Sequence, residues 1–321
     1  MTTMRIRIYS MTILLLALQA GFPKPSGPHK EPIRAELTRL GRDGLLSLAS
    51  VGKSHLDVIA FDQRSPVEGR QFLKEGTTLD GAISLDGSEI AFSLWRKDGN
   101  RRLNYLGVIR QDGTDFRSFP EIRAPYGMCW SDDKSKLVLS ARDLDQQHEP
   151  PDYSLEILDL RSKTTLKVDT RAYVTSQCWS PDGKRIVYQA DDSVRTYDVE
   201  KQNWLILGKG KDATWSPDGN WIAFLDDDTY YAVRPSGQDR KVLFKTKGAL
   251  TGLLWAPDCN IVAYVSSASF FEGAWKALDV GIARLRVRRL DDNSEDWISE
   301  LSDAHVPNYQ WVKSSDLGVP K

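Results

Sequence analysis

The chain is poor in the residue types and motifs that carry most enzymatic chemistry. Its 321 residues include only four histidines, and none of these stands at metal-ligand spacing from another. It has no Gly-x-Ser-x-Gly turn of the kind that bears a hydrolase nucleophile, and no glycine-rich phosphate-binding motif of the P-loop kind. These absences argue against a serine hydrolase, a nucleotide-dependent enzyme and a histidine metal site. We therefore expect no catalytic residue, no bound metal and no cofactor.

Strong net charge and helical periodicity are also lacking. The 43 basic residues nearly balance the 44 acidic ones, which gives no electrostatic reason to expect a nucleic acid or an anionic membrane surface as partner. The one basic stretch, residues 284–289, alternates arginine with apolar residues, and this predicts a strand with one solvated face. Helical periodicity is almost absent beyond the first residues, so the pattern does not fit an α/β fold.

What the chain does contain is one short pattern repeated five times. A tryptophan, or once an isoleucine, leads into a polar turn with aspartate in fourth place, and an apolar strand follows. The leading residues are Ile83, Trp130, Trp179, Trp215 and Trp255. The turn aspartates, separated by 47, 49, 36 and 40 residues, are Asp86, Asp133, Asp182, Asp218 and Asp258. Recurrence at this length is typical of the four-stranded blade of a β-propeller.

The repeated turn has a physical rationale. In the copy at residues 180–183, proline presets φ for a type I turn, and serine and aspartate can hydrogen-bond nearby backbone. The glycine that follows accepts a positive φ, so a hairpin is expected at each copy. The large apolar tryptophan in front of the turn would then wedge between packed sheets, which makes its expected role structural.

The two chain ends supply fragments of one further blade. The copy at Trp179 predicts strands at 174–180, 185–189, 193–198 and 204–207, and the next copy predicts strands at 213–216, 221–225, 230–234 and 241–244. A last anchor, Trp311, stands in an innermost strand at 309–312, with no room for three more. Near the other end, residues 45–49, 57–61 and 71–73 predict three strands without an anchor.

One blade shared by both ends explains these fragments and removes unpaired sheet edges. The predicted fold is therefore an all-β, six-bladed β-propeller of four-stranded antiparallel blades, closed by N- and C-terminal strands in a single blade. Length alone would suggest two domains, but repeats that form one closed array override that. The long interval between Asp258 and Trp311 leaves another arrangement open.

The first residues predict export. Arg5 and Arg7 precede a short apolar run at 11–18 that ends near Ala20, as in a signal peptide. The run is too short to span a bilayer comfortably, although an uncleaved anchor remains an alternative. We expect residues 1–20 to be a signal peptide, 21–40 a proline-rich tether, 41–314 the propeller and 315–321 a tail. The predicted location is periplasmic or secreted, without stable membrane insertion after cleavage.

The repeat units resemble those of a known family. The Trp-Ser-Pro-Asp-Gly-x-x-Ile-x-Tyr/Phe segments at 179–188 and 215–224 are similar to the repeats of TolB-type six-bladed propellers, relatives of the WD-repeat proteins. The same units occur in the propellers of prolyl-oligopeptidase-like peptidases. The resemblance covers about residues 45–313 and implies a propeller that docks partner proteins of the cell envelope. The chain departs from the periplasmic family member, which carries an additional α/β domain before its propeller.

Long loops on one face predict a binding surface. In a propeller the connections from second to third strand share a face, and here they are long at 96–102, 142–152 and 266–278. The last of these contains Phe270, Phe271 and Trp275, and exposed aromatic residues often anchor protein interfaces.

Arg142 and His148 in the middle connection complete the predicted partner-binding set. In the alternative interpretation, the three aromatic residues fold back to plug the channel mouth or to cover a blade.

The three cysteines raise the question of whether two of them form a disulfide. Cys129 and Cys178 each stand directly before an anchor tryptophan, so they occupy equivalent positions on neighbouring inner strands. A disulfide requires their Cα atoms to approach within about 7 Å. Because inner strands of adjacent blades usually diverge, we expect two packed thiols rather than a bridge. Cys259 replaces the glycine of its turn.

Together these observations predict a monomeric, non-catalytic scaffold that binds a protein or peptide of the cell envelope. The alternative is a propeller enzyme (a lyase, lactonase or hydrolase) or a carbohydrate binder with its site in the central funnel. Three or more carboxylates and histidines converging on the channel would favour the enzyme, whereas an apolar or basic rim would favour docking.

Overall fold

The structure is a computed structural model that describes residues 33, 44–48, 56–60, 77–98, 101–142, 153–169, 174–246, 248, 253–256, 259–268, 282–301 and 309–312. The chain separates into two compact units, Met1–Glu31 and Pro32–Lys321, and every described residue belongs to the second unit. In that part of the chain, no helix is long and apolar enough to cross a membrane.

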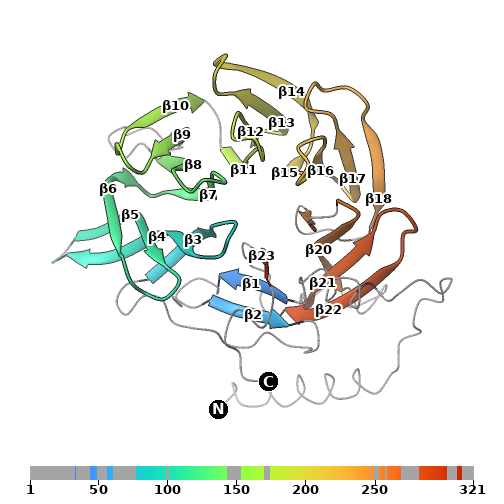
Figure 1. Ribbon diagram of the computed structural model, residues 1–321, viewed down its shortest axis with the longest axis horizontal. Coiled ribbons are helices and arrows are strands. Elements are labelled where there is room, and N and C mark those ends of the chain that lie inside the picture. Colours follow the sequence, from blue (N-terminus) through green and yellow to red (C-terminus); the bar gives the residue numbers. More distant parts are fainter. Residues whose placement is uncertain are drawn as a thin grey trace, which may run out of the picture. The chain divides into compact units, whose positions relative to one another are not determined.

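The described elements are 23 β-strands, and most of them form five four-stranded antiparallel sheets, here called blades 1 to 5 (Figure 1). Blade 1 holds β3 (Thr77–Ile83), β4 (Glu89–Asp98), β5 (Arg101–Arg110) and β6 (Arg117–Arg123). Blade 2 holds β7 (Tyr126–Trp130), β8 (Lys136–Arg142), β9 (Tyr153–Asp159) and β10 (Thr165–Asp169). Blade 3 holds β11 (Val174–Trp179), β12 (Arg185–Ala190), β13 (Ser193–Asp198) and β14 (Asn203–Lys209).

The last two blades follow the same order of strands. Blade 4 holds β15 (Lys211–Trp215), β16 (Ile222–Asp226), β17 (Thr229–Val233) and β18 (Lys241–Lys245). Blade 5 holds β19 (Leu254–Trp255), β20 (Ile261–Ala268), β21 (Ile282–Arg289) and β22 (Glu295–Leu301). The predicted all-β architecture of four-stranded antiparallel blades is confirmed.

The remaining sheet joins the two ends of the second unit. It has the strand order β2-β1-β23, with β1 (Gly44–Leu48) between β2 (Leu56–Ala60) and β23 (Tyr309–Val312). Leu45 stands opposite Trp311 in an antiparallel register. The pairing agrees with a blade built from both chain ends. The count of six blades and the closure of the ring stay predictions.

The apolar core lies between consecutive blades. The first strands of neighbouring blades pack together, β3 on β7, β7 on β11 and β11 on β15. Each of the four anchor tryptophans whose side chains are described belongs to the cluster that joins its own blade to the preceding one: Trp130, Trp179, Trp215 and Trp255. All four are at most 7% exposed. The tryptophans therefore wedge between sheets, as the sequence predicts.

The repeated turn forms the predicted hydrogen bonds. In blade 3, the Ser180 hydroxyl donates to Asp182 Oδ1 over 2.6 Å and accepts the backbone N–H of Arg185. The same carboxylate oxygen accepts the backbone N–H of Lys184, and Gly183 has a φ of 67°. Because the Ser180 and Asp182 side chains bond to each other and to the backbone of the turn, they hold the hairpin that sets the start of the next strand.

Two local predictions are wrong. Residues 96–102 do not form a long loop, because β4 runs to Asp98 and β5 begins at Arg101, so a long hairpin continues through this segment. The arginine face of β21 is half-buried rather than solvated, since Arg286 and Arg288 both donate to the carboxylate of Glu295, over 2.6 and 3.0 Å.

Candidate functional site

The predicted docking residues fall almost entirely outside the described part of the chain. Phe270, Phe271, Trp275 and His148 are not described, and Arg142 is placed only as the last residue of β8, without its side chain. Their role in binding a partner therefore stays a prediction. Of the anchor set, Asp258 lies outside the described residues, and Trp311 is placed only by its backbone in β23.

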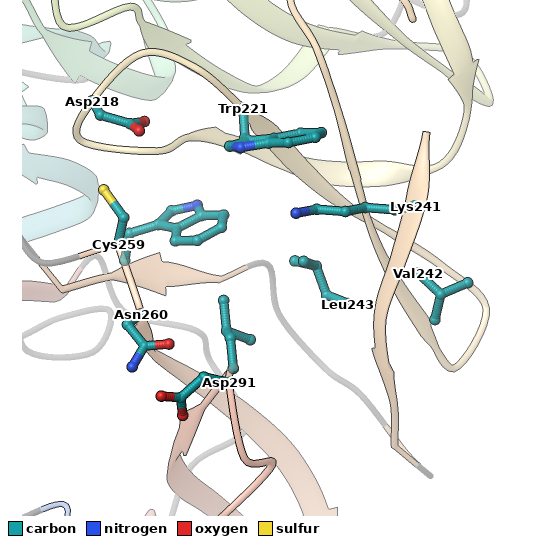
Figure 2. Close-up of a pocket in the computed structure, with 10 residues that line it drawn as sticks. Asp218, Trp221, Lys241, Val242, Leu243, Cys259, Asn260 and Asp291 are labelled. Carbon is teal, nitrogen blue, oxygen red and sulfur yellow. The ribbon is translucent and has the colours of Figure 1, made fainter. Parts of the chain in front are cut away.

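A pocket with a volume of 360 Å³ opens between blades 4 and 5. In Figure 2, Asp218 and Trp221 lie on the blade 4 side, and Cys259, Asn260 and Asp291 lie on the blade 5 side. Both sides are built from repeat turns, so the fold places the pocket directly above an anchor tryptophan, Trp255, which is also part of its lining.

The blade 4 wall of the pocket carries positive charge over an aromatic ring. Lys241 Nζ lies 3.9 Å from the ring centre of Trp221, and the Arg234 guanidinium carbon lies 4.0 Å from it. Such cation–π contacts hold the ring in place and keep the two cations at the pocket and its rim.

The carboxylate of Asp218 adds a negative charge to the lining of the same pocket. Burial acts to raise its pKa, but hydrogen bonds from the Ser216 hydroxyl and from the backbone and side chain of Asn220 outweigh burial and hold the pKa below its usual range. The pocket thus presents an ionised acid and a lysine within one small volume, which suits a polar or zwitterionic segment of a ligand.

The anchor tryptophan that lines the pocket has a buried hydrogen-bond donor. Trp255 is 7% exposed, and its indole Nε1 has no hydrogen-bond partner among the described residues. Nε1 of Trp179 and of Trp215 is likewise buried and unpaired, whereas Nε1 of Trp130 donates to the carbonyl of Ala82 over 3.1 Å. An unpaired buried donor costs about 1–3 kcal/mol, so these three anchors lack a stabilising contact that Trp130 has.

A second pocket repeats this arrangement one blade earlier. It lies between blades 3 and 4, has a volume of 310 Å³ and is lined by Asp182, Arg185, Trp215 and Gly219, among others. Each of these occupies the repeat position of a residue in the first pocket, with Trp215 in the place of Trp255 and Gly219 in the place of Cys259. Equivalent repeat positions therefore line both pockets.

The joint between blades 1 and 2 is filled instead. Lys134, at the repeat position of Gly219 and Cys259, donates from Nζ to Asp86 Oδ2 over 2.7 Å and to the Ser88 hydroxyl over 3.1 Å. Burial tends to raise the pKa of Asp86, but the Lys134 ammonium, followed by hydrogen bonds from Ser88 and Ser84, holds it well below its usual range. A lysine at this one position therefore lies where a pocket remains between blades 3 and 4 and between blades 4 and 5.

The outermost strand of blade 3 exposes apolar side chains. β14 is the edge strand of its sheet, and Trp204 is 55% and Ile206 51% exposed. Both stand opposite residues that face blade 2, because Trp204 pairs with Tyr197 and Ile206 pairs with Arg195. Arg195 in turn reaches Asp169 of blade 2 and lies 5.5 Å from the Trp204 ring. The rim of this joint is an apolar stripe beside an ion pair.

The opposite face of β14 is apolar as well. Leu205 is 43% exposed and stands in line with Leu207, which belongs to the core between blades 3 and 4. Across that joint, Val242 of β18 is 53% exposed. We define Leu205, Trp204 and Ile206 as the β14 stripe.

The inner strands carry two buried carboxyls. Burial raises the pKa of Asp80 on β3, although its carboxylate accepts the backbone N–H of Gly127 over 2.5 Å. Burial also raises the pKa of Asp212 on β15, which accepts a hydrogen bond from the Ser176 hydroxyl over 2.9 Å. Among the described residues, no three His, Cys, Asp or Glu side chains gather closely enough to hold a metal ion.

Comparison with known proteins identifies the fold. No family model matches the chain, and no curated protein matches it. The crystal structure of TolB from Acinetobacter baumannii is similar with a TM-score of 0.58 and 15% identity, over 84% of this chain and 66% of that one. A putative TolB from Agrobacterium tumefaciens is similar with a TM-score of 0.59 and 16% identity, over 79% of this chain and 90% of that one.

An oligogalacturonate lyase in complex with manganese is similar with a TM-score of 0.52 and 14% identity, over 77% of this chain and 70% of that one. The chain thus spans slightly less than two thirds of the length of the Acinetobacter protein. At these identities the likeness shows the fold, a TolB-like β-propeller, and it confirms the resemblance carried by the repeats.

Proposed function

We propose that the chain is an exported, monomeric β-propeller scaffold that binds a protein or peptide partner in the cell envelope and performs no catalysis of its own. Its TolB-like fold supports the proposal at the level of architecture. The observation that carries it is the β14 stripe, where Trp204 and Ile206 are more than half exposed on an edge strand.

The exposed apolar edge strand β14 has the features of a protein interface. Its unpaired backbone groups form a template for another strand, and proteins usually blunt such edges with charge or proline. The β14 stripe instead combines an aromatic, two aliphatic side chains and the adjacent Arg195, which are the residue types that anchor protein interfaces. An extended peptide that adds to this edge would satisfy its backbone and cover its apolar side chains.

Site-directed photo-crosslinking tests the proposal. A photoreactive phenylalanine analogue at position 204, in cells that naturally produce the chain, is expected to trap one specific protein. The control position is Lys167, an exposed polar residue on the outer strand β10. The trapped protein, once purified, should bind the Trp204→Ser/Ile206→Ser variant at least about ten-fold more weakly than it binds wild type or Lys167→Ser.

The predicted loop surface is tested in a second part of the same experiment. A Phe270/Phe271/Trp275 triple alanine variant is tested against the same purified partner, and weaker binding would extend the interface to that face. The proposal fails if position 204 traps nothing beyond the Lys167 control and the triple variant recovers every partner as well as wild type does.

A propeller enzyme is the second candidate. It is favoured by the similarity to a lyase and by the raised pKa values of Asp80 and Asp212 on inner strands. Oligogalacturonides with Mn²⁺ would then yield an unsaturated product, seen as a rise in ultraviolet absorbance. Turnover that is abolished in Asp80→Asn and Asp212→Asn would replace the scaffold proposal.

A further inference from the structure

Two thiols from neighbouring blades are in direct contact. Cys129 Sγ on β7 lies 3.4 Å from Cys178 Sγ on β11, and both residues are free, half-buried cysteines. Each sulfur also lies 3.6 Å from the carbonyl oxygen of the tryptophan that follows it. The expectation of two packed thiols rather than a bridge agrees with the structure, although the inner strands lie closer together than the usual divergence of blades suggests.

The contact arises from the repeat itself. The two cysteines hold the same position, directly before the anchor tryptophan of blade 2 and of blade 3. The next two blades carry Thr214 and Leu254 at this position, so the pair is confined to one joint. β7 and β11 pack directly on each other, and the two sulfurs need to approach by only about 1.4 Å to reach the length of a disulfide bond.

We propose that Cys129 and Cys178 form a disulfide that cross-links blades 2 and 3 when the folded chain meets a thiol–disulfide oxidant such as oxidised glutathione. One thiolate attacks the external disulfide, which forms a mixed disulfide and releases one glutathione thiolate. The second cysteine then attacks the protein sulfur of the mixed disulfide and releases the second glutathione. The protein loses two protons and two electrons, and one oxidised glutathione becomes two reduced ones.

The pair has an inherent order of attack. The hydrogen bond with Cys178 lowers the pKa of Cys129, against the opposing effect of burial. The same hydrogen bond, with burial, raises the pKa of Cys178. Cys129 therefore reaches the thiolate form first and makes the initial attack, and Cys178 resolves the mixed disulfide.

The bond would tie together residues 49 positions apart and clamp the inner ends of two blades. A loop of this length, when closed in the unfolded chain as well, lowers the entropy gained on unfolding. Oxidised protein is therefore expected to unfold about 5 °C or more above reduced protein, provided that the native geometry accepts the bond without strain.

The test uses the full chain and counts thiols. Reduced protein is incubated with oxidised glutathione, then denatured and alkylated with iodoacetamide, and its intact mass is measured. The reduced chain carries three thiols. The expected result is a fall from three alkylated cysteines to one, with a peptide map that joins Cys129 to Cys178. This measurement needs only the wild-type protein, so the proposal can be tested even if a variant fails to fold.

Three variants sharpen the result. Cys259→Ser, the matched control, should lose both of its remaining thiols and gain the same thermal shift. Cys129→Ser and Cys178→Ser should gain no thermal shift, and Cys178→Ser should stop at the glutathione mixed disulfide. The proposal is overturned if wild type keeps all three thiols, or if the map shows only Cys259 or glutathione adducts.

Discussion

The joint between blades 1 and 2 and the joint between blades 4 and 5 are built from the same repeat and differ in how completely they are filled. In the first, Lys134 bridges to Asp86 and the indole of Trp130 donates to Ala82. In the second, Cys259 takes the lysine position, the indole of Trp255 is unpaired, and a 360 Å³ pocket remains. The repeat specifies the blade, while one turn residue decides whether the joint stays open.

The turn position that separates the two joints is under a backbone constraint. Lys134 has a φ of 57°, Cys259 of 60° and Gly219 of 69°, so all three adopt the left-handed region that favours glycine. A side chain there costs roughly 1 kcal/mol of backbone strain. Lys134 offsets that cost through its contacts with Asp86 and Ser88 across the joint. Gly219 avoids the strain, and a pocket remains at its joint.

The largest expected difference between the joints lies in the anchor tryptophans. Trp130→Phe removes the indole hydrogen bond to the buried carbonyl of Ala82, so it should lower the free energy of unfolding by about 1 kcal/mol beyond the smaller ring's packing loss. Trp255→Phe removes a donor that had no partner, so only the packing loss remains. Urea unfolding of both variants measures the difference, and equal destabilisation would show that the two indoles are equivalent.

A smaller effect is expected from the ion pair in the filled joint. The lowered pKa of Asp86 contributes stability that is present above its unfolded pKa, near 4, and is lost as the pH falls through the folded value. In Lys134→Met the folded pKa moves back toward the ordinary value, so less stability is lost on acidification. Unfolding curves at neutral and at acid pH should lie closer together for the variant than for wild type. The matched control is Lys163→Met, because Lys163 also has a positive φ.

The smallest effect is expected from filling the open joint. Cys259→Lys places an ammonium near Asp218, as Lys134 stands near Asp86. Because Asn220 already donates to both Asp218 oxygens, the gain should be under about 1 kcal/mol. Thermal unfolding measures it, and the salt dependence of the melting temperature separates an ion pair from a packing change. A gain that persists unchanged at high salt would contradict the ion-pair assignment.

Much of the fold could be predicted from sequence because its determinants are local. The turn and the tryptophan before it lie within a few residues, and strands predicted at 193–198 and 309–312 coincide with β13 and β23. The long hairpin of blade 1 was missed because Arg96, Lys97, Arg101 and Arg102 resemble a charged loop. Their strands stay paired, since Lys97 stands opposite Arg102.

The candidate sites were much harder to predict, because the pockets and the thiol contact join residues a whole repeat apart. The alignment of repeats places Lys134, Gly219 and Cys259 in one column, but the aspartate each of them faces belongs to the preceding blade. The contact of Cys129 with Cys178 likewise depends on how closely two inner strands approach. The sequence predicted a strand at the β14 stripe but not its exposure. The alternation of side chains along a strand shows which face of the sheet a residue lies on, but not whether another element covers that face.

The pairing of β1 with β23 joins two segments that lie far apart along the chain. During synthesis, β1 can join β2 early, but its other edge has no partner until residues 309–312 leave the ribosome. A chain interrupted before that point would keep a bare strand edge, open to proteases and to pairing with other chains. This one register therefore makes the protection of β1 depend on residues translated long after it.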